Sequence, residues 1–336
     1  MTARDRSVPK GSVQRLVIDS KVLKRNLLGD PARREIAVYV PAEQSGAGLP
    51  LLLDLVGYTS GGPAHVNWRA FGENMPERLD RLIAAKAMQP VMVAMPDCFT
   101  RLGGNQYINS AAMGRWEDFL IDEMLPFVEK RFGCGGEGRR AVFGKSSGGY
   151  GAMVQGLRRP DIWSAVACHS GDMGFEICYV HEFPGTLRAL AKHDGSIEKF
   201  VTTLETARKR GASDMHALMM LAMAATYDPA PDQYLGIRLP IDLETCELIP
   251  ERWSNWLAWD PLTLVESHAD NLKRLKALYI DCGSLDQYNL VFGARRLHRA
   301  LERRGVRHRY DEFPDNHSDV DYRMDESLPY LAKALG

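Results

Sequence analysis

The segment Ala141–Met153, AVFGKSSGGYGAM, constrains the fold of this chain more than any other. Three apolar residues lead into a glycine-rich turn, and small residues at helical spacing follow it. A phosphate-binding loop would need a glycine five residues before Gly144. Position 139 is an arginine, and Ala141–Phe143 has the composition of a buried strand, so the sequence does not favour a phosphate loop.

The same segment fits a nucleophile elbow, a sharp turn from a strand into a helix with the pattern Gly-x-Ser-x-Gly. Gly144 and Gly148 fall where such a turn has no room for side chains, and Ser146 stands between them. The following helix would direct N–H groups and the positive end of its dipole toward the serine. Ser147 is the rival hydroxyl, but Lys145 stands where its motif would need a glycine. We therefore predict that Ser146 is a nucleophile.

A nucleophilic serine needs a base, and the base needs an acid that orients it. In this architecture both follow the serine in chain order, at the carboxyl ends of strands. Asp286 follows the apolar run Ala277–Cys282. His317 follows the run His308–Phe313. We predict that Asp286 and His317 complete a catalytic triad with Ser146.

Two residues remain as alternatives for the acid and the base. His169 and Asp172 both follow the strand expected at Ile162–Cys168, so either could reach the same edge of the sheet. His169 precedes every candidate acid in the chain, which does not match the expected order. Asp281 lies inside its strand and is expected to be structural.

The tetrahedral intermediate of acyl transfer also needs hydrogen-bond donors for its oxyanion. One donor should be the backbone N–H of Ser147, directly after the nucleophile. The second should come from the loop after the strand Pro50–Val56, where Gly57 permits a close approach. We predict that this second donor is the backbone N–H of Tyr58.

The rest of the chain predicts strands that alternate with helices. The clearest helix is Arg115–Phe132, whose apolar residues fall on one stripe. Alternation of this kind is typical of a mostly parallel sheet with helices on both faces. The eight expected strands are Val13–Asp19, Arg34–Val40, Pro50–Val56, Val91–Met95, Ala141–Phe143, Ile162–Cys168, Ala277–Cys282 and His308–Phe313.

One interval breaks this alternation. Residues 175–274 carry helical stretches and then the loop-rich Pro229–Pro250, without a clear strand. We expect a single domain, residues 1–336, in which this interval is an insertion that forms a cap over one edge of the sheet. Its methionines are either plain helix core or an adaptable surface that contacts substrate; they are Met215, Met219, Met220 and Met223.

Charge and composition exclude several functional classes. The formal net charge of −1 gives no support for a general role in binding nucleic acid or anionic membranes. The six cysteines are scattered, so we expect reduced thiols and no metal site or other cofactor. The first fifteen residues lack an apolar core, so we expect no signal peptide there, and no apolar run is long enough to span a bilayer. We expect a cytoplasmic protein that acts on small molecules; the sequence leaves open whether it is a homo-oligomer.

With these motifs in place, the chain resembles the esterase D (putative esterase) family of α/β-hydrolases. That family includes S-formylglutathione hydrolases, feruloyl and acetyl-xylan esterases, enterochelin-esterase-like enzymes and mycolyltransferases. The resemblance implies an α/β-hydrolase fold with Ser146 as nucleophile, Asp286 as acid and His317 as base. It rests on Arg34–Pro41, Pro50–Gly57, Arg115–Phe132, Ala141–Trp163, Asp281–Asp286 and Asn316–Ser318.

The sequence departs from the family pattern at positions that concern the substrate. Val56-Gly57 stands where the family often has His-Gly, and Lys145 where it often has His or Gln. Lys145 is either a solvated or salt-bridged side chain or a site of attraction for an anionic substrate. Asp54, among leucines in a strand, needs a partner or its pKa will rise. Aromatic residues near the expected catalytic edge would suit aryl groups. The candidate substrate-binding residues are the aromatic Trp68 and Tyr107 together with Lys145 and Asp172.

These observations predict a serine carboxylesterase that hydrolyses carboxylic esters, including aryl or feruloyl-type esters, through an acyl-enzyme. The same triad would also support an acyltransferase or a thioesterase. A non-catalytic hydrolase fold that serves as a binding module is the alternative from a different class. The chain order of Ser146, Asp286 and His317 counts against that alternative.

Overall fold

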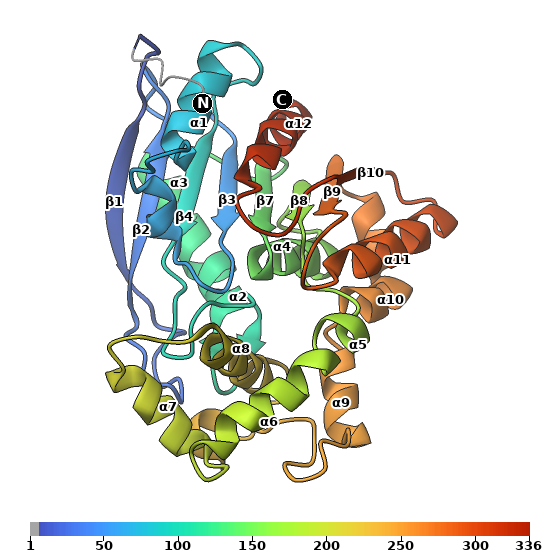
Figure 1. Ribbon diagram of the computed structural model, residues 1–336. Coiled ribbons are helices and arrows are strands. Elements are labelled where there is room, and N and C mark those ends of the chain that lie inside the picture. The colour runs from blue at the N-terminus through green and yellow to red at the C-terminus, as the bar shows by residue number, and fades with distance from the viewer. Residues whose placement is uncertain (1–6) are drawn as a thin grey trace.

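A computed structural model describes residues 7–336 and contains an eight-stranded sheet (Figure 1). The strand order is β1-β2-β4-β3-β7-β8-β9-β10. β2 is antiparallel to both of its neighbours, and the other pairs are parallel. All eight predicted strands are confirmed: β1 Ser12–Asp19, β2 Arg33–Val40, β3 Leu51–Leu55, β4 Met92–Pro96, β7 Arg140–Lys145, β8 Ala165–His169, β9 Ala277–Gly283 and β10 Arg309–Phe313. A short hairpin, β5 Asn109–Ser110 and β6 Gly114–Arg115, lies outside this sheet.

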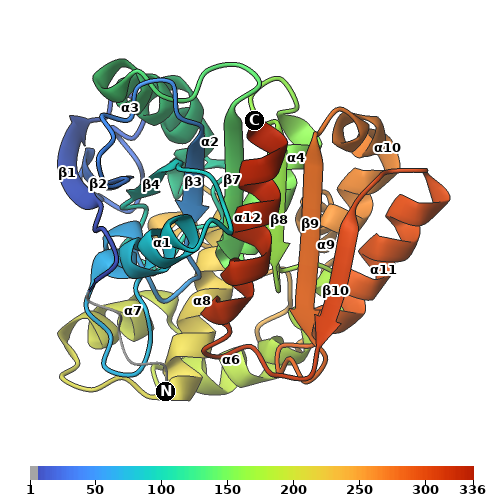
Figure 2. The same ribbon diagram turned by 90° about the horizontal axis from the view of Figure 1, so that it is seen from above.

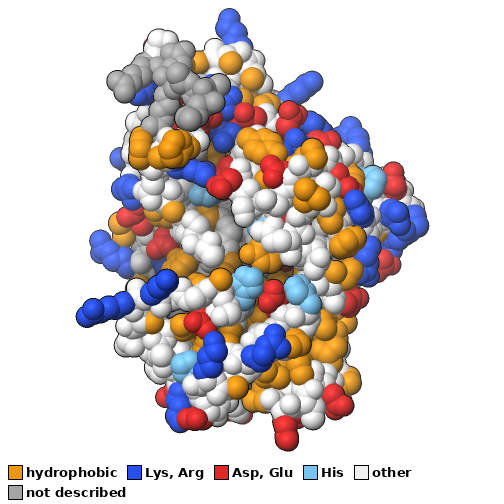
Figure 3. Space-filling view, in the orientation of Figure 1, with side chains coloured by type: hydrophobic (Ala, Val, Ile, Leu, Met, Phe, Trp, Pro, Cys, Tyr) orange, Lys and Arg blue, Asp and Glu red, His pale blue; other side chains and the backbone are white. Residues whose placement is uncertain are grey.

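Residues 1–6 are part of the N-terminal stretch in which we expect no signal peptide, and they lie outside the described residues. Within residues 7–336, no helix combines the length and the apolar character that crossing a bilayer requires. Positive and negative side chains are interspersed over the face seen in Figure 3, in line with the net charge of −1.

Helices cover both faces of the sheet, because the central strands are apolar on both sides (Figure 2). One face packs against α1 Met75–Ala84 and α12 Met324–Leu335. The other face packs against α4 Ser147–Arg158, α10 Pro261–Lys273, α11 Leu290–Arg303 and the helix predicted at Arg115–Phe132. That helix consists of α2 Trp116–Asp118, a π-helical stretch η2 Phe119–Met124 and α3 Leu125–Phe132.

The interval expected to form the cap contains more helix than the sequence predicted. Figure 1 shows its first helices below the carboxyl ends of the parallel strands. α10, however, packs against α4 and α11 and so belongs to the layer that covers the sheet. The part that stands apart from the sheet therefore ends near Asp260 instead of at residue 274. We call residues 175–260 the inserted segment; its helices are α5 Phe175–Cys178, η3 Val180–Glu182, α6 Phe183–Ala191, α7 Ile197–Thr206, α8 Ala212–Tyr227, η4 Tyr234–Gly236 and α9 Pro250–Leu257.

Aromatic packing joins the inserted segment to the sheet-bearing part. The ring centroid of Tyr150, in α4, lies 5.8 Å from that of Tyr227 in α8. Tyr227 in turn lies 5.0 Å from Phe175 and 5.4 Å from Trp256. The Asp260 carboxylate accepts hydrogen bonds from the N–H groups of Gly174 and Phe175, which ties the two ends of the segment together. One apolar core thus runs from the sheet into the inserted segment.

Candidate active site

Ser146 occupies a strained turn between β7 and α4. Its backbone has φ 58° and ψ −126°, and positive φ is uncommon for residues other than glycine. Its N–H donates to the carbonyl of His169 at the end of β8, at 3.0 Å. Its carbonyl accepts from the N–H of Tyr150 at 2.9 Å and so begins the hydrogen bonding of α4. The serine side chain is half-buried at the carboxyl end of the sheet.

The glycines around Ser146 are required by close backbone packing. A Cβ atom on Gly148 would lie 1.8 Å from the carbonyl oxygen of Leu55 in β3. A Cβ atom on Gly144 would lie 2.3 Å from the same oxygen. Neither position can accept a side chain without moving β3 or α4, which agrees with the interpretation of the turn as an elbow.

The predicted oxyanion strand lies directly against this turn. A Cβ atom on Gly57 would be 3.4 Å from the Cβ of Ser146 and 3.9 Å from its Oγ. Tyr58 follows, and its hydroxyl donates to the carbonyl of Leu102 at 2.6 Å. Ser147 begins α4, where the first N–H groups have no acceptor within the helix.

Tyr107 differs from its expected role. Its side chain is only 1% exposed, and its hydroxyl donates to the carbonyl of Val56 at 2.6 Å. In this structure Tyr107 therefore supports the oxyanion strand from inside the core and does not line an open site. The sequence places it in a loop near the catalytic edge but carries no sign of this burial.

Asp286 and His317 meet beyond β9 and β10. Oδ2 of Asp286 lies 2.7 Å from Nδ1 of His317, and the carboxylate is buried. Oδ1 of Asp286 accepts from the N–H of Tyr288 at 2.9 Å. The N–H of His317 donates to Oε1 of Gln287 at 2.9 Å. These bonds fix the imidazole ring with Nδ1 toward the carboxylate, which leaves Nε2 available.

Tyr288 forms a wall beside this histidine. The two ring centroids are 4.9 Å apart, and the rings are nearly perpendicular at 79°. On its other side Tyr288 faces His216 of α8, at 5.8 Å between centroids. The inserted segment thus reaches the candidate site through α8.

Asp172 lies in the same neighbourhood, and its carboxylate is buried. Its Oδ2 accepts hydrogen bonds from the hydroxyl of Tyr179 at 2.9 Å and from Nε2 of Gln106 at 3.1 Å. Burial raises the pKa of Asp172, while these two hydrogen bonds and the charge of His317 oppose the rise. Gln106 also donates to Oγ of Ser147 at 3.1 Å, so Asp172 is connected both to the elbow and to the histidine.

The remaining predicted substrate residues lie at the edge of the site. Nζ of Lys145 is 3.7 Å from Oδ1 of Asp321, a residue in η5 Asp321–Arg323, so the lysine has an acidic partner. Trp68 is 70% exposed in the loop that follows η1 Gly62–Val66. Of the four methionines, Met223 contacts the network around Asp172, with its Sδ 2.9 Å from Nε2 of Gln106.

His169, the alternative base, has other partners. Its Nδ1 lies 2.7 Å from Oδ1 of Asp281, and its Nε2 lies 2.8 Å from Oγ of Ser327 in α12. All three side chains are buried. Both ring nitrogens are therefore engaged away from Ser146, and Asp281 has the structural position that the sequence suggested.

Three residues of the site were missed by sequence reasoning: Gln106, Tyr179 and His65. Gln106 and Tyr179 contact Asp172, and Nδ1 of His65 lies 2.6 Å from Oδ2 of Asp54. Each contact joins residues from separate elements, and none belongs to a motif with a fixed spacing. A single sequence carries no signal for them.

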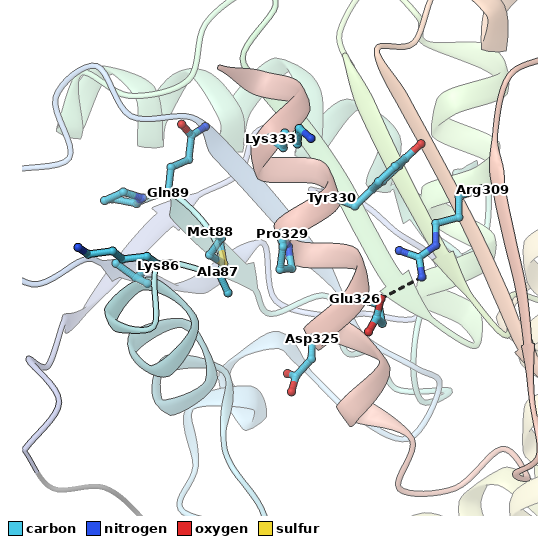
Figure 4. A pocket seen from close by; sticks show the side chains of 12 residues that line it. Lys86, Ala87, Met88, Gln89, Arg309, Asp325, Glu326, Pro329, Tyr330 and Lys333 are labelled. Carbon is cyan, nitrogen blue, oxygen red and sulfur yellow. Dashed lines mark hydrogen bonds and ion pairs between the residues drawn. The ribbon is translucent and has the colours of Figure 1, made fainter.

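A groove of about 770 Å³ lies away from these residues, between the end of α1 and α12 (Figure 4). Basic and acidic side chains mix along it, including Lys86, Arg309 and Glu326. Among residues 7–336, no group of three or more His, Cys, Asp or Glu side chains is arranged to hold a metal ion.

Fold and site together define an α/β-hydrolase. The chain belongs to the family described as putative esterase, whose model matches residues 31–325. It is therefore an ester hydrolase, and its substrates are small-molecule esters, as the resemblance implied. A comparison with curated proteins yields no match.

Solved structures of esterases share the fold over nearly the whole chain. A ferulic acid esterase is 20% identical, with a TM-score of 0.62 over 97% of this chain and 99% of that one. An S-formylglutathione hydrolase from Agrobacterium tumefaciens is 16% identical, with a TM-score of 0.58 over 100% and 99%. The substrate-bound fluorophosphonate-binding serine hydrolase F of Staphylococcus aureus is also 16% identical, with a TM-score of 0.58 over 97% and 99%.

The packing at Gly148 leads to a prediction about stability. Gly148→Ala should lower the free energy of unfolding by about 3 kcal/mol or more, because the added methyl meets a backbone oxygen that cannot move alone. Gly185→Ala in α6 is the matched control, since the nearest atom to its Cβ is the end of Arg188 at 3.9 Å. Urea unfolding should show the control unchanged or more stable by up to about 1 kcal/mol. A Gly148→Ala variant as stable as the parent protein would contradict this account of the turn.

Proposed function

We propose that the protein is a serine carboxylesterase that forms an acyl-enzyme on Ser146. The observation that carries the proposal is the strained backbone of Ser146, with φ 58°, between a strand and a helix. Strain of this kind at a surface turn persists where the surrounding structure enforces it, and it concentrates at functional sites. The buried pair of Asp286 and His317 supplies the base and the acid that a serine nucleophile needs.

In the first step, Nε2 of His317 takes the hydroxyl proton as Oγ of Ser146 bonds to the ester carbon. The Asp286 carboxylate stays ionised, holds the ring in the required tautomer and stabilises the imidazolium that forms. The carbonyl π electrons move to the oxygen, which becomes the oxyanion of a tetrahedral intermediate. The N–H groups of Tyr58 and Ser147 donate to this oxyanion.

In the second step, the intermediate collapses to the acyl-enzyme and the alcohol leaves with the proton from His317. Water then attacks the acyl carbon and gives its proton to His317, and collapse of the second intermediate returns that proton to Ser146. The two steps release one alcohol and one carboxylic acid for each water consumed. No metal or organic cofactor takes part in this scheme.

Aryl esters, including feruloyl-type esters, are the substrate class that we favour. The support is the ring of Tyr288, which packs against His317 beside the space that the acyl group would take. The names of solved relatives include a ferulic acid esterase, which points the same way. In this proposal the inserted segment is the cap, with Asp172, Gln106 and Tyr179 forming the inner wall of the substrate pocket.

Acyl transfer to an alcohol and hydrolysis of a thioester would use the same groups, and a non-catalytic binding module would use none of them. A panel of acetyl, aryl and thioester substrates, each with and without an added alcohol, separates these outcomes. Release of free acid from an oxygen ester at the highest kcat/KM supports the carboxylesterase, and a product ester would indicate transfer.

Ser146→Ala should abolish covalent labelling by a fluorophosphonate and lower kcat on p-nitrophenyl acetate by about 10⁴-fold or more. The matched control is Ser147→Ala, which removes the neighbouring hydroxyl but keeps the backbone N–H expected to bind the oxyanion. The control should still be labelled at Ser146, as mass spectrometry of the labelled peptide would show. Labelling that persists in Ser146→Ala and is lost in Ser147→Ala would move the nucleophile by one residue.

Tyr288→Ala should lower kcat/KM for methyl ferulate about 5-fold more than for p-nitrophenyl acetate. The reason is the loss of an aromatic contact worth about 1 kcal/mol beyond its buried area, which an aryl acyl group would make and an acetyl group would not. Tyr310→Ala is the control, because Tyr310 of β10 stacks on His298 of α11, away from the site. Equal losses for the two esters would contradict the aryl pocket.

A further inference from the structure

Two ion pairs lie among the loops of the candidate site. His65 pairs with Asp54 at 2.6 Å, and Lys145 pairs with Asp321 at 3.7 Å. Asp321 also pairs with Arg69. These residues answer two questions that the sequence left open, since His65 is the partner of the buried Asp54 and Asp321 is the partner of Lys145.

Each member of these pairs stands beside a predicted catalytic group. Asp54 and His65 lie on either side of Tyr58 in the chain, four residues before it and seven after. Lys145 immediately precedes Ser146, and Asp321 follows His317 by four residues. The Asp54–His65 pair closes the oxyanion loop onto β3, the Lys145–Asp321 pair joins the nucleophile turn to the histidine loop, and the Arg69–Asp321 pair connects the two.

The pairs also share one face of the sheet. Asp54 in β3 stands opposite Phe143 of β7, and Lys145 is two residues further along β7. Side chains two residues apart on a strand point to the same face, so Asp54 and Lys145 project to the side covered by α1 and α12. η5, which carries Asp321, leads into α12 on that side.

One member of each pair has a pKa shifted toward its charged form, His65 in the first pair and Asp321 in the second. Burial lowers the pKa of His65, but the carboxylates of Asp54 and Asp321 outweigh burial and raise it overall, against a smaller opposing effect of Arg69. Burial raises the pKa of Asp321, but Lys145, Arg69 and His65 outweigh that effect and lower it overall.

Two further charged side chains, Glu73 and Arg78, line the cavity of about 260 Å³ beside His65. Both have partners of their own, since Glu73 pairs with Arg81 and Arg78 with Asp325. The charge of His65 is therefore balanced by Asp54 and Asp321, and not by these neighbours.

The position of Asp54 suggests more than a structural role. Its carboxylate is fully buried, and Oδ1 has no hydrogen-bond partner among the described residues. A buried charge with an unsatisfied oxygen is destabilising, and an apolar residue would fit a strand of leucines better. The only ion pair that it forms among residues 7–336 is the one that closes the oxyanion loop onto β3.

We propose that the Asp54–His65 and Lys145–Asp321 pairs are positioning elements of the esterase site, which hold the Tyr58 N–H and the His317 loop against Ser146. The proposal rests on the proposed function of Ser146, His317 and Tyr58. In this proposal Lys145 holds the nucleophile turn in position through its ion pair with Asp321 and does not bind an anionic substrate. Because donors aligned for the oxyanion act in the transition state, losing these pairs should lower kcat with little change in KM.

The Asp54–His65 pair predicts how kcat changes with pH. A histidine whose pKa is raised by folding contributes fully below its unfolded value of about 6.5, and the contribution is lost as pH rises through the folded value. The kcat of the parent enzyme should therefore fall on the alkaline side as His65 loses its proton. His65→Gln should be slower at neutral pH and should lack this alkaline fall.

The test measures kcat and KM on p-nitrophenyl acetate, from about pH 5 to about pH 9, for four variants. His65→Gln and Lys145→Met should lower kcat about 10-fold at neutral pH, with KM within about 2-fold, since displacing one oxyanion donor forfeits part of the 10²–10³-fold effect of losing it. Lys145→Arg keeps the charge beside Asp321 and should retain at least about half of kcat. Lys199→Met is the control, because it removes the exposed Lys199–Asp194 pair of the inserted segment; it should match the parent enzyme.

The outcomes separate this proposal from the proposed function. If the parent enzyme is labelled at Ser146 but His65→Gln and Lys145→Met keep their kcat, the positioning proposal fails and the esterase mechanism stands. If Lys145→Met raises KM for negatively charged esters without lowering kcat, the lysine binds substrate and the proposal also fails. If the parent enzyme shows neither labelling nor turnover, both proposals fail. Should His65→Gln not fold, a parent kcat that stays flat above neutral pH would still overturn the role of His65.

Discussion

The contact of one carbonyl oxygen with two glycines is the constraint on which the site depends. The oxygen of Leu55 lies so close to Gly144 and Gly148 that no side chain fits at either position. This contact brings the end of β3 against the start of α4 and leaves Ser146 in a backbone conformation that it would not adopt alone. It also sets Gly57, two residues after Leu55, directly beside the serine. A single packing requirement thus brings the proposed nucleophile, Ser146, and the proposed oxyanion strand together without any side-chain contact.

Three buried carboxylates lie near this turn, and their different partners suit them to the different roles that we propose. Asp286 faces His317, Asp54 faces His65, and Asp172 accepts only from the neutral donors Tyr179 and Gln106. A carboxylate opposite a histidine favours the imidazolium, whereas one held by neutral donors has a pKa raised by its burial. Three acids of one type near one sheet edge therefore suit three tasks: orienting the base, bracing the loop and shaping the pocket.

Sequence reasoning succeeded where the signal is local. The eight strands follow from continuous apolar or β-branched runs, and the Gly-x-Ser-x-Gly turn follows from its strand and helix neighbours. It failed at α10, whose buried residues Leu264, Val265, Ala269 and Leu272 have helical spacing, because the sequence does not show that this helix packs against α4 and α11; the boundary of the inserted segment was therefore set too late. It also misjudged Tyr107, because burial of a loop residue depends on what packs over it. Partners such as His65 for Asp54 depend on how separate segments meet in space, and one sequence carries no record of that.

The inserted segment is bound too firmly to open as one rigid body. Tyr227 and Trp256 pack with Phe175 and Tyr179 in a single aromatic cluster that also includes Tyr150 of α4. The four rings of the segment would move together, but opening would uncover Tyr150 of α4 and the faces of Phe175 and Tyr227 that pack on it; at about 1.5–3 kcal/mol for each fully buried side chain, exposing these three would cost up to about 4.5–9 kcal/mol. That cost is comparable to the whole stability of a typical domain, about 5–15 kcal/mol. In the proposed enzyme, substrates therefore enter through movements smaller than the segment, and Tyr179 of the proposed inner wall belongs to the same core as the sheet.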